Sequence, residues 1–274
     1  MIEIPESHTL ARQLNETVKG KTIETVLAGK SPHKFAFFTG EPECYPPLLE
    51  GKRVDGAEAL SGWIQLRIGE LRLTFNDGTN LRFFEAGEKV SEKHQLYMEF
   101  KDGTVLTCSI QMYGGIHLFR ERENDNIYYM SAKSAPSPLT EAFDFDHFAS
   151  LWDAAKETLS AKGLLATEQR IPGLGNGVLQ DILFRAGVNP KSKLKDLEDK
   201  RRAIFESIRE TLAEMTEKGG RDTEKDLRGN PGGYRTILSS KTWKGPCPVC
   251  GGVIERKAYL GGNVYYCPNC QPLK

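Results

Sequence analysis

The spacing of the cysteines gives the clearest chemical signal in this chain. Six cysteines are present, and four of them form two CxxC pairs, Cys247 with Cys250 and Cys267 with Cys270. Each CxxC turn presents two thiolates to one metal ion, and two such turns complete a tetrahedral site that is typical of structural zinc. We therefore expect one Zn²⁺, with no open coordination position for catalysis. The residues between the pairs predict a short hairpin, with strands at 253–254 and 264–266 and a turn at 261–263. Such a hairpin is too small to fold alone, so zinc would supply its folding free energy.

A second stretch, residues 169–184, combines glycines with a helix start. Pro172 ends one predicted helix, a Gly-Leu-Gly turn follows, and a new helix begins around Asn176. Backbone N–H groups at such a start favour a phosphate group. A plain turn between two helices explains the same residues equally well, so this stretch alone leaves both interpretations open.

The predicted secondary structure, which positions these residues, changes from one part of the chain to the next. Residues 5–20 carry apolar side chains every four positions, which predicts an amphipathic helix. From 22 to 130, short apolar runs such as Trp63–Ile68 and Leu71–Phe75 are separated by turn signals, which predicts half-buried strands of a β-sandwich or barrel. A small, polar, proline-containing stretch predicts a linker over 131–139, and a helical period follows from 140.

Charge and hydropathy narrow the class of protein. The net charge is zero, but residues from 160 onward carry more Lys and Arg than Asp and Glu, and the preceding residues carry the opposite excess. This asymmetry indicates contact with a polyanion, although ordinary surface variation explains it equally well. No run of about 18 apolar residues occurs, and the first residues lack the basic and apolar regions of a signal peptide. We therefore expect a cytoplasmic protein that does not enter a membrane.

Together the motifs resemble the formamidopyrimidine-DNA glycosylase and endonuclease VIII family. Residues 169–184 are similar to the family's helix–two-turn–helix, and Lys162 precedes Asn176 by 14 residues, like the family's pair of phosphate contacts. The other matching segments are Gly219–Thr223, Gly229–Tyr234, the finger cysteines with the following Gln271, and Met1–Glu6. The resemblance is dense after residue 160 and thin between 22 and 130.

The resemblance implies an α+β protein with three folded parts. These are an N-terminal β-sandwich with a leading helix over 1–130, a helix–two-turn–helix domain over 140–240, and a zinc-finger β-hairpin over 241–274, with the linker over 131–139 between the first two. It also implies a monomer that binds double-stranded DNA containing a damaged base or an abasic site, with Lys162 and Asn176 on phosphates.

The same resemblance points to the N-terminus as the place of the chemistry. Family members remove damaged bases and then nick the strand through a Schiff base, which is formed by an N-terminal proline beside a proton-handling glutamate. Glu3 matches the glutamate, but Ile2 stands at the proline position, so the free amine would be that of Met1. A displacement by one residue, about 3.5 Å of chain, would misplace this amine relative to Glu3.

Further positions that contact DNA in the family also differ here. The family lysine would fall at Gly62, and Gly262 stands where the finger arginine would be. Met112 and Tyr113 lie where the intercalating loop is expected and could wedge between bases. His94 resembles a DNA-contact histidine. Met112 and Tyr113 are explained equally well as ordinary residues at strand ends. A lone histidine such as His94 is more often an ordinary surface residue.

Two classes of function follow from this pattern. The first is a DNA glycosylase in which Glu3, or less favourably Glu6, activates water as general base, with a lyase step that is impaired or unusual. The second is a catalytically inactive protein that binds damaged or abasic DNA. In the second, Glu3 serves only as an acid at a helix N-terminus. RNA binding is a third, weaker hypothesis.

Overall fold

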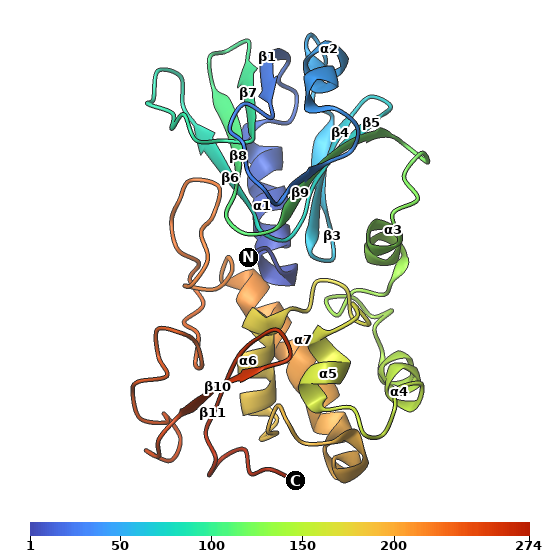
Figure 1. The fold of residues 1–274 in the computed structure, drawn as a ribbon, viewed down its shortest axis with the longest axis vertical. Helices are drawn as coiled ribbons and strands as arrows, with labels where there is room; N and C mark the ends of the chain where they lie inside the picture. Colours follow the sequence, from blue (N-terminus) through green and yellow to red (C-terminus); the bar gives the residue numbers. More distant parts are fainter. The chain divides into compact units, whose positions relative to one another are not determined.

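The computed structural model describes every residue, Met1–Lys274, and divides the chain into two compact units. The first unit contains Met1–Lys133 together with Glu224–Gly232, and the second contains Ser134–Thr223 and Gly233–Lys274. In Figure 1 the first unit holds the blue-to-green strands, and the second holds the yellow and orange helices and the red hairpin. None of the helices is long and apolar enough to cross a lipid bilayer.

The first unit is a β-sandwich, as the strand pattern predicted. One sheet has the strand order β1-β7-β8-β6 and the other has the order β2-β9-β5-β4-β3. All neighbouring strands are antiparallel except β2 and β9, which are parallel. The strands are β1 (Ile23–Ala28), β2 (Ala36–Phe38), β3 (Gly56–Leu60), β4 (Trp63–Ile68), β5 (Leu71–Phe75), β6 (Thr79–Phe84), β7 (Leu96–Phe100), β8 (Val105–Ile110) and β9 (Gly114–Arg120). A 3-10 turn (Pro42–Cys44) and the short helix α2 (Tyr45–Leu49) follow β2.

Burial on both faces explains why the five-stranded sheet is so apolar. Successive side chains of a strand point to opposite faces, and both faces of β5 are buried. Ile64 and Leu66 of β4 belong to the main core between the sheets. Trp63 belongs to a separate cluster with Phe119 and Tyr129. Helix α3 (Ile127–Ser134) supplies Tyr129, so this helix covers the face of the sheet that points away from the main core.

The leading helix α1 (Ile4–Thr17) forms part of the core of the first unit. Leu10 and Leu14 are buried in the main core, and Val18, the C-cap residue, is buried with them. The sequence predicted a helix over 5–20, and its apolar period matches this buried face. The helix contacts β3 and β4, and Figure 1 shows it running along the sandwich.

The segment Glu224–Gly232 differs from the sequence prediction, which placed it within the helical domain. Its Leu227 is fully buried in the core of the first unit. The Leu227 N–H donates to Gln13 Oε1 at 2.9 Å, and its carbonyl accepts from the Phe83 N–H at 2.9 Å. A buried apolar side chain and paired backbone groups therefore fix this segment to α1 and β6, a contact that no local pattern encodes.

The predicted linker also differs in its first residues. The small and polar stretch after 130 predicted irregular chain over 131–139, but α3 continues to Ser134. Ala132 is buried beside Trp63, and its carbonyl accepts a hydrogen bond from Ser61 Oγ at 3.2 Å. Packing against the sheet therefore extends the helix into residues whose composition is typical of a loop.

The second unit contains the predicted helices. They are α4 (Phe145–Asp153), α5 (Ala161–Ala166), α6 (Asn176–Arg185) and α7 (Arg201–Glu217), with two short 3-10 turns at Leu194–Asp196 and Glu198–Lys200. Four apolar residues at helical spacing along α7 are buried: Ile204, Ile208, Leu212 and Met215. Helix α6 begins at Asn176 after the N-cap Gly175, where the glycine pattern predicted a helix start.

The unit ends in a β-hairpin with a tight turn. Strands β10 (Glu255–Tyr259) and β11 (Gly262–Tyr266) are antiparallel, with Tyr259 opposite Gly262. The sequence predicted a turn at residues 261–263 and a first strand at 253–254, so both lie one to two residues away from their predicted places. The turn consists of Leu260 and Gly261, which have positive φ values of 45° and 73°. Positive φ at both central residues suits the right-handed twist of a two-residue hairpin.

Candidate functional site

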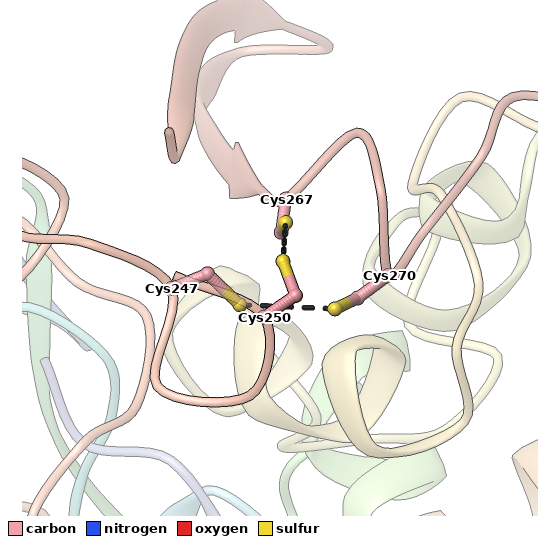
Figure 2. A group of neighbouring side chains, drawn as sticks. All are labelled: Cys247, Cys250, Cys267 and Cys270. Carbon is pink, nitrogen blue, oxygen red and sulfur yellow. Dashed lines mark hydrogen bonds between the residues drawn. The ribbon is translucent and has the colours of Figure 1, made fainter. Parts of the chain in front are cut away.

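The four cysteines of the finger converge on one point, as their spacing predicted. Figure 2 shows the four thiols of Cys247, Cys250, Cys267 and Cys270 facing one another, and all four sulfur atoms lie within 4.8 Å of one another. The Cys247–Cys270 and Cys250–Cys267 sulfur distances are 3.7 and 3.5 Å. Zinc–sulfur bonds of about 2.3 Å in a tetrahedron separate the sulfurs by about 3.8 Å. The residues therefore fit one structural zinc ion, with all four positions filled by thiolates.

Two glutamines attach the finger to the helices of the second unit. Gln271 is fully buried; its Oε1 accepts from the Cys267 N–H at 3.1 Å, and its Nε2 donates to the Val188 carbonyl at 2.8 Å. Gln180 of α6 accepts from the Tyr265 N–H at 3.0 Å and donates to the Asn263 carbonyl at 3.2 Å. Each side-chain amide bonds the backbone of the finger, so the zinc site and α6 are held as one assembly.

Lys162 and Asn176 meet at the finger hairpin. Lys162 Nζ donates to the Tyr259 carbonyl at 2.7 Å, and Asn176 Nδ2 donates to the Asn263 carbonyl at 2.9 Å. A Cβ atom at Gly262 would lie 3.4 Å from Asn176 Nδ2 and 3.5 Å from Lys162 Nζ. Positions separated by nearly a hundred residues are thus brought together; their contact with DNA stays a prediction.

This cluster has hydrogen-bonding capacity to spare. Lys162 is only 2% exposed, and burial lowers the pKa of its ammonium from the ordinary value. An ammonium has three donor hydrogens, and one of them is taken by the Tyr259 carbonyl. Asn176 Oδ1 is buried and has no hydrogen-bond partner. Buried polar groups are normally paired; the spare donors of Lys162 suit an anionic ligand, whereas Asn176 Oδ1 can only accept a hydrogen bond.

The N-terminus is anchored by Ile2. Its side chain is 6% exposed and belongs to the main core, whereas Met1 is 48% exposed and its amino group forms an ion pair with Glu224. Glu224 belongs to the segment that returns to the first unit. The residue at the position of the family's proline is therefore part of the hydrophobic core, and the amine of Met1 is held by a carboxylate from a distant part of the chain.

Glu3 and Glu6 form a capping box at the start of α1. Glu3 is the N-cap residue, its side chain accepts from the Glu6 N–H, and Glu6 Oε2 accepts from the Glu3 N–H at 3.2 Å. Both side chains are buried, 3% and 5% exposed. The capping contacts give Glu3 a structural role, and its catalytic role stays a prediction.

The turn that carries Gly62 lies beside α1. Ser61 has a positive φ of 52°, and its carbonyl accepts a hydrogen bond from Ser7 of α1. Gly62 is buried in the turn between β3 and β4. The first unit thus presents backbone and hydroxyl groups where the family resemblance implies a lysine.

His94 is not a surface residue. It is 6% exposed, its ring lies 5.4 Å from that of Tyr97, and its Nδ1 has no hydrogen-bond partner. Burial, and then the charge of Lys30, lower the pKa of this imidazole. The sequence gives no sign of this burial because His94 lies in a polar segment, and its predicted contact with DNA would require the ring to become accessible.

Met112 and Tyr113 protrude from the turn between β8 and β9. They are 60% and 57% exposed, and the Tyr113 ring lies 4.5 Å from that of Phe35. Gly78, with φ of 81°, passes so close to the Tyr113 carbonyl that a Cβ there would overlap it. The exposed pair fits the predicted wedge. Phe35 was missed by the sequence analysis because its place beside Tyr113 depends on the β2–β9 pairing.

Comparison with known proteins identifies the relatives of this chain. Residues 244–273 match the family model described as "Zinc finger found in FPG and IleRS". The formamidopyrimidine-DNA glycosylases of Bacillus cereus and Geobacillus kaustophilus are 25% and 28% identical to the chain, and the matches cover 99% of the chain and 99% or more of each relative. The MutM (Fpg) protein of Thermus thermophilus has a TM-score of 0.82 at 25% identity, covering 99% of both chains.

Over nearly its whole length, this chain is similar to members of the formamidopyrimidine-DNA glycosylase and endonuclease VIII family. The Lactococcus lactis Fpg structure, described as a complex with an abasic site containing DNA, shares the fold with a TM-score of 0.83 at 24% identity. The match covers 98% of this chain and 99% of that one. The comparison confirms the α+β fold, the zinc finger and the family predicted from the sequence.

Proposed function

We propose that this protein of base-excision repair binds duplex DNA with a damaged base or an abasic site, and removes damaged bases without the usual Schiff-base step. The proposal rests on the cluster of Lys162, Asn176 and the finger hairpin, in which the Lys162 ammonium and the Asn176 NH2 group each use one donor on a carbonyl and keep donors for phosphate. The Lactococcus lactis relative, of the same fold, is described in complex with abasic-site DNA. The chain would act as a monomer.

The glycosylase step would be hydrolytic. With the target nucleotide flipped out of the helix, Glu3 would take a proton from water as the water oxygen bonds to C1′ and the bond from C1′ to the base breaks. The base would leave with the electron pair of that bond. This step needs no amine, which suits a chain in which Ile2 is buried and the Met1 amine is paired with Glu224.

The alternative is a catalytically silent protein that recognises damaged or abasic DNA. Three observations favour it: the capping role of Glu3, the ion pair of the Met1 amine, and the glycines at positions 62 and 262. In this case the wedge of Met112 and Tyr113 would recognise distorted DNA without leading to chemistry.

Borohydride trapping on a duplex with a single abasic site tests the Schiff base. The N-terminus of the protein is first verified by mass. We expect tight binding without a covalent adduct. An adduct that disappears when the amine of Met1 is blocked would overturn the absence of Schiff-base chemistry and make Met1 a relocated nucleophile. A Glu224→Gln variant, which removes the partner of the amine, shows whether the ion pair suppresses trapping.

Base release separates the enzyme from the silent binder. A set of duplexes, each with one oxidised or ring-opened base, is incubated with the wild type and with Glu3→Gln and Glu6→Gln. We expect release by the wild type and by Glu6→Gln but not by Glu3→Gln. Release that persists in Glu3→Gln would refute the role of Glu3 as general base. No release by the wild type from any duplex that it binds would support the silent binder.

A further inference from the structure

Lys191 lies next to the cluster of Lys162 and Asn176. The Lys162 N–H donates to the Pro190 carbonyl at 3.0 Å, and the Ala161 N–H donates to the Ser192 carbonyl at 3.0 Å. These two hydrogen bonds hold the segment around Lys191 beside the start of α5. A lysine that is 29 positions away in the sequence is therefore a spatial neighbour of the buried Lys162.

Two tyrosine rings of the finger hold the Lys191 ammonium. Its Nζ lies 5.8 Å from the ring centroid of Tyr259 on β10 and 5.6 Å from that of Tyr266 on β11. Both distances are within the range of cation–π attraction. Tyr259 thus contacts two lysines, Lys191 through its ring and Lys162 through its carbonyl.

The two ammonium groups meet no carboxylate. The single acidic residue of the hairpin, Glu255, accepts a hydrogen bond from the Tyr266 hydroxyl at 2.8 Å and lies 3.6 Å from Lys257. Lys191 is half-buried, so it is held in place but open to solvent on one side. Two neighbouring cations repel each other unless an anion lies between or beside them. The two tyrosine rings fix the Lys191 ammonium but do not neutralise it, so its charge remains available to an anionic ligand.

We infer that Lys191 is a further phosphate-binding residue, which holds a DNA phosphate next to the one held by Lys162 and Asn176. The residues beside the finger hairpin would then bind two phosphates of one strand, one at Lys162 and one at Lys191. Aromatic rings beneath the ammonium limit its motion, so less side-chain entropy is lost when the phosphate binds. This inference rests on the proposed binding of damaged DNA.

The salt dependence of binding tests the inference. The affinity for the abasic duplex is measured by fluorescence anisotropy over a range of NaCl concentrations, for the wild type, Lys191→Met, Lys191→Arg and Lys195→Met. Methionine keeps an apolar stem over the rings but removes the charge. The control residue Lys195 is exposed and is one of the lysines of the same segment. Loss of one phosphate contact reduces the slope of log K against log salt by about 1.

We expect the reduced slope for Lys191→Met and the wild-type slope for Lys191→Arg and Lys195→Met. The double variant Lys162→Met/Lys191→Met should lose about 2 from the slope, because the two lysines hold different phosphates. A wild-type slope for Lys191→Met would overturn the inference, and so would a lowered melting temperature or zinc content with no change in slope. If the wild type itself does not bind the duplex, the proposed function fails instead.

Discussion

The two units of this protein differ in how much of the family's site they retain. In the second unit, Lys162, Asn176 and the zinc finger meet through hydrogen bonds between residues far apart in the chain. In the first unit, the proline position is occupied by the buried Ile2, and a carboxylate holds the Met1 amine. The fold is that of the relatives, but the residues at the predicted positions of the family's Schiff-base chemistry differ in the first unit.

Under the proposed function, this contrast means that binding and chemistry change separately within one fold. The proposed phosphate contacts lie on α5, α6 and the finger, where the side chains involved bond the backbone of the hairpin. The family's nucleophile depends on a single residue at the chain terminus. On the proposed function, Ile2 at that position removes the nucleophile, and its side chain is packed in the core. The experiments below test each side of this comparison.

Removal of zinc should have the largest effect, and it should be confined to the second unit. Metal binding supplies about 10 kcal/mol or more in small zinc fingers, and the hairpin has only two strands. We expect Cys250→Ser to lose the metal, the order of β10 and β11, and DNA binding. Zinc content is measured by mass spectrometry and hairpin order by hydrogen exchange.

Cys44→Ser is the matched control, because Cys44 is an exposed cysteine outside the finger. It should keep one zinc ion and full binding. If Cys250→Ser retained both the zinc and the affinity for the duplex, the four-thiolate site would be refuted. If hydrogen exchange also increased throughout the β-sandwich, the separation of effects between the two units would fail.

A substitution at Leu227 tests the first unit. Its side chain is fully buried in the sandwich core although it lies in the returning segment. Leu→Ala at a buried site costs about 2–5 kcal/mol, so Leu227→Ala should lower the free energy of unfolding by that amount. Faster hydrogen exchange at the Phe83 amide, which donates to the Leu227 carbonyl, should accompany it.

The neighbouring Arg228→Ala supplies the control for Leu227. Arg228 forms an ion pair with Glu85 in which both side chains are about half exposed, 52% and 54%. Such a pair contributes about 0–1 kcal/mol. Equal and small effects of the two substitutions would contradict the assignment of residues 224–232 to the first unit.

The sequence predicted what local patterns encode. Cysteine spacing predicted the zinc site, alternation predicted β4 and β5 at their observed bounds, and the glycine turn predicted the start of α6 at Asn176. Each of these depends on residues close together in the chain. The hairpin turn was displaced by one residue, because any of the neighbouring glycines could have occupied the positive-φ position.

Contacts between segments far apart in the chain could not be predicted from local sequence patterns. The return of Leu227 to the first unit, the burial of His94 and the pairing of Met1 with Glu224 all depend on tertiary packing. So does the cage of Lys191, whose two tyrosines lie more than sixty positions away. A polar segment has the same composition whether it is exposed to solvent or packed against another strand, so composition alone does not predict its burial.

A substitution at Gly262 should have the smallest effect, and it tests phosphate binding by the second unit. A Cβ atom at position 262 would lie 3.5 Å from Lys162 Nζ and 3.4 Å from Asn176 Nδ2, both ordinary contact distances, and the backbone there has no positive φ. Gly262→Arg should therefore fold and add a guanidinium to the phosphate site. We expect the salt slope of binding to rise by about 1, and the melting temperature without DNA to fall slightly because a third cation joins Lys162 and Lys191. Gly262→Ala, which adds only the Cβ atom, should match the wild type. If Gly262→Arg has the same slope as Gly262→Ala, no phosphate lies at this position, and the mode of binding proposed for the second unit is refuted there.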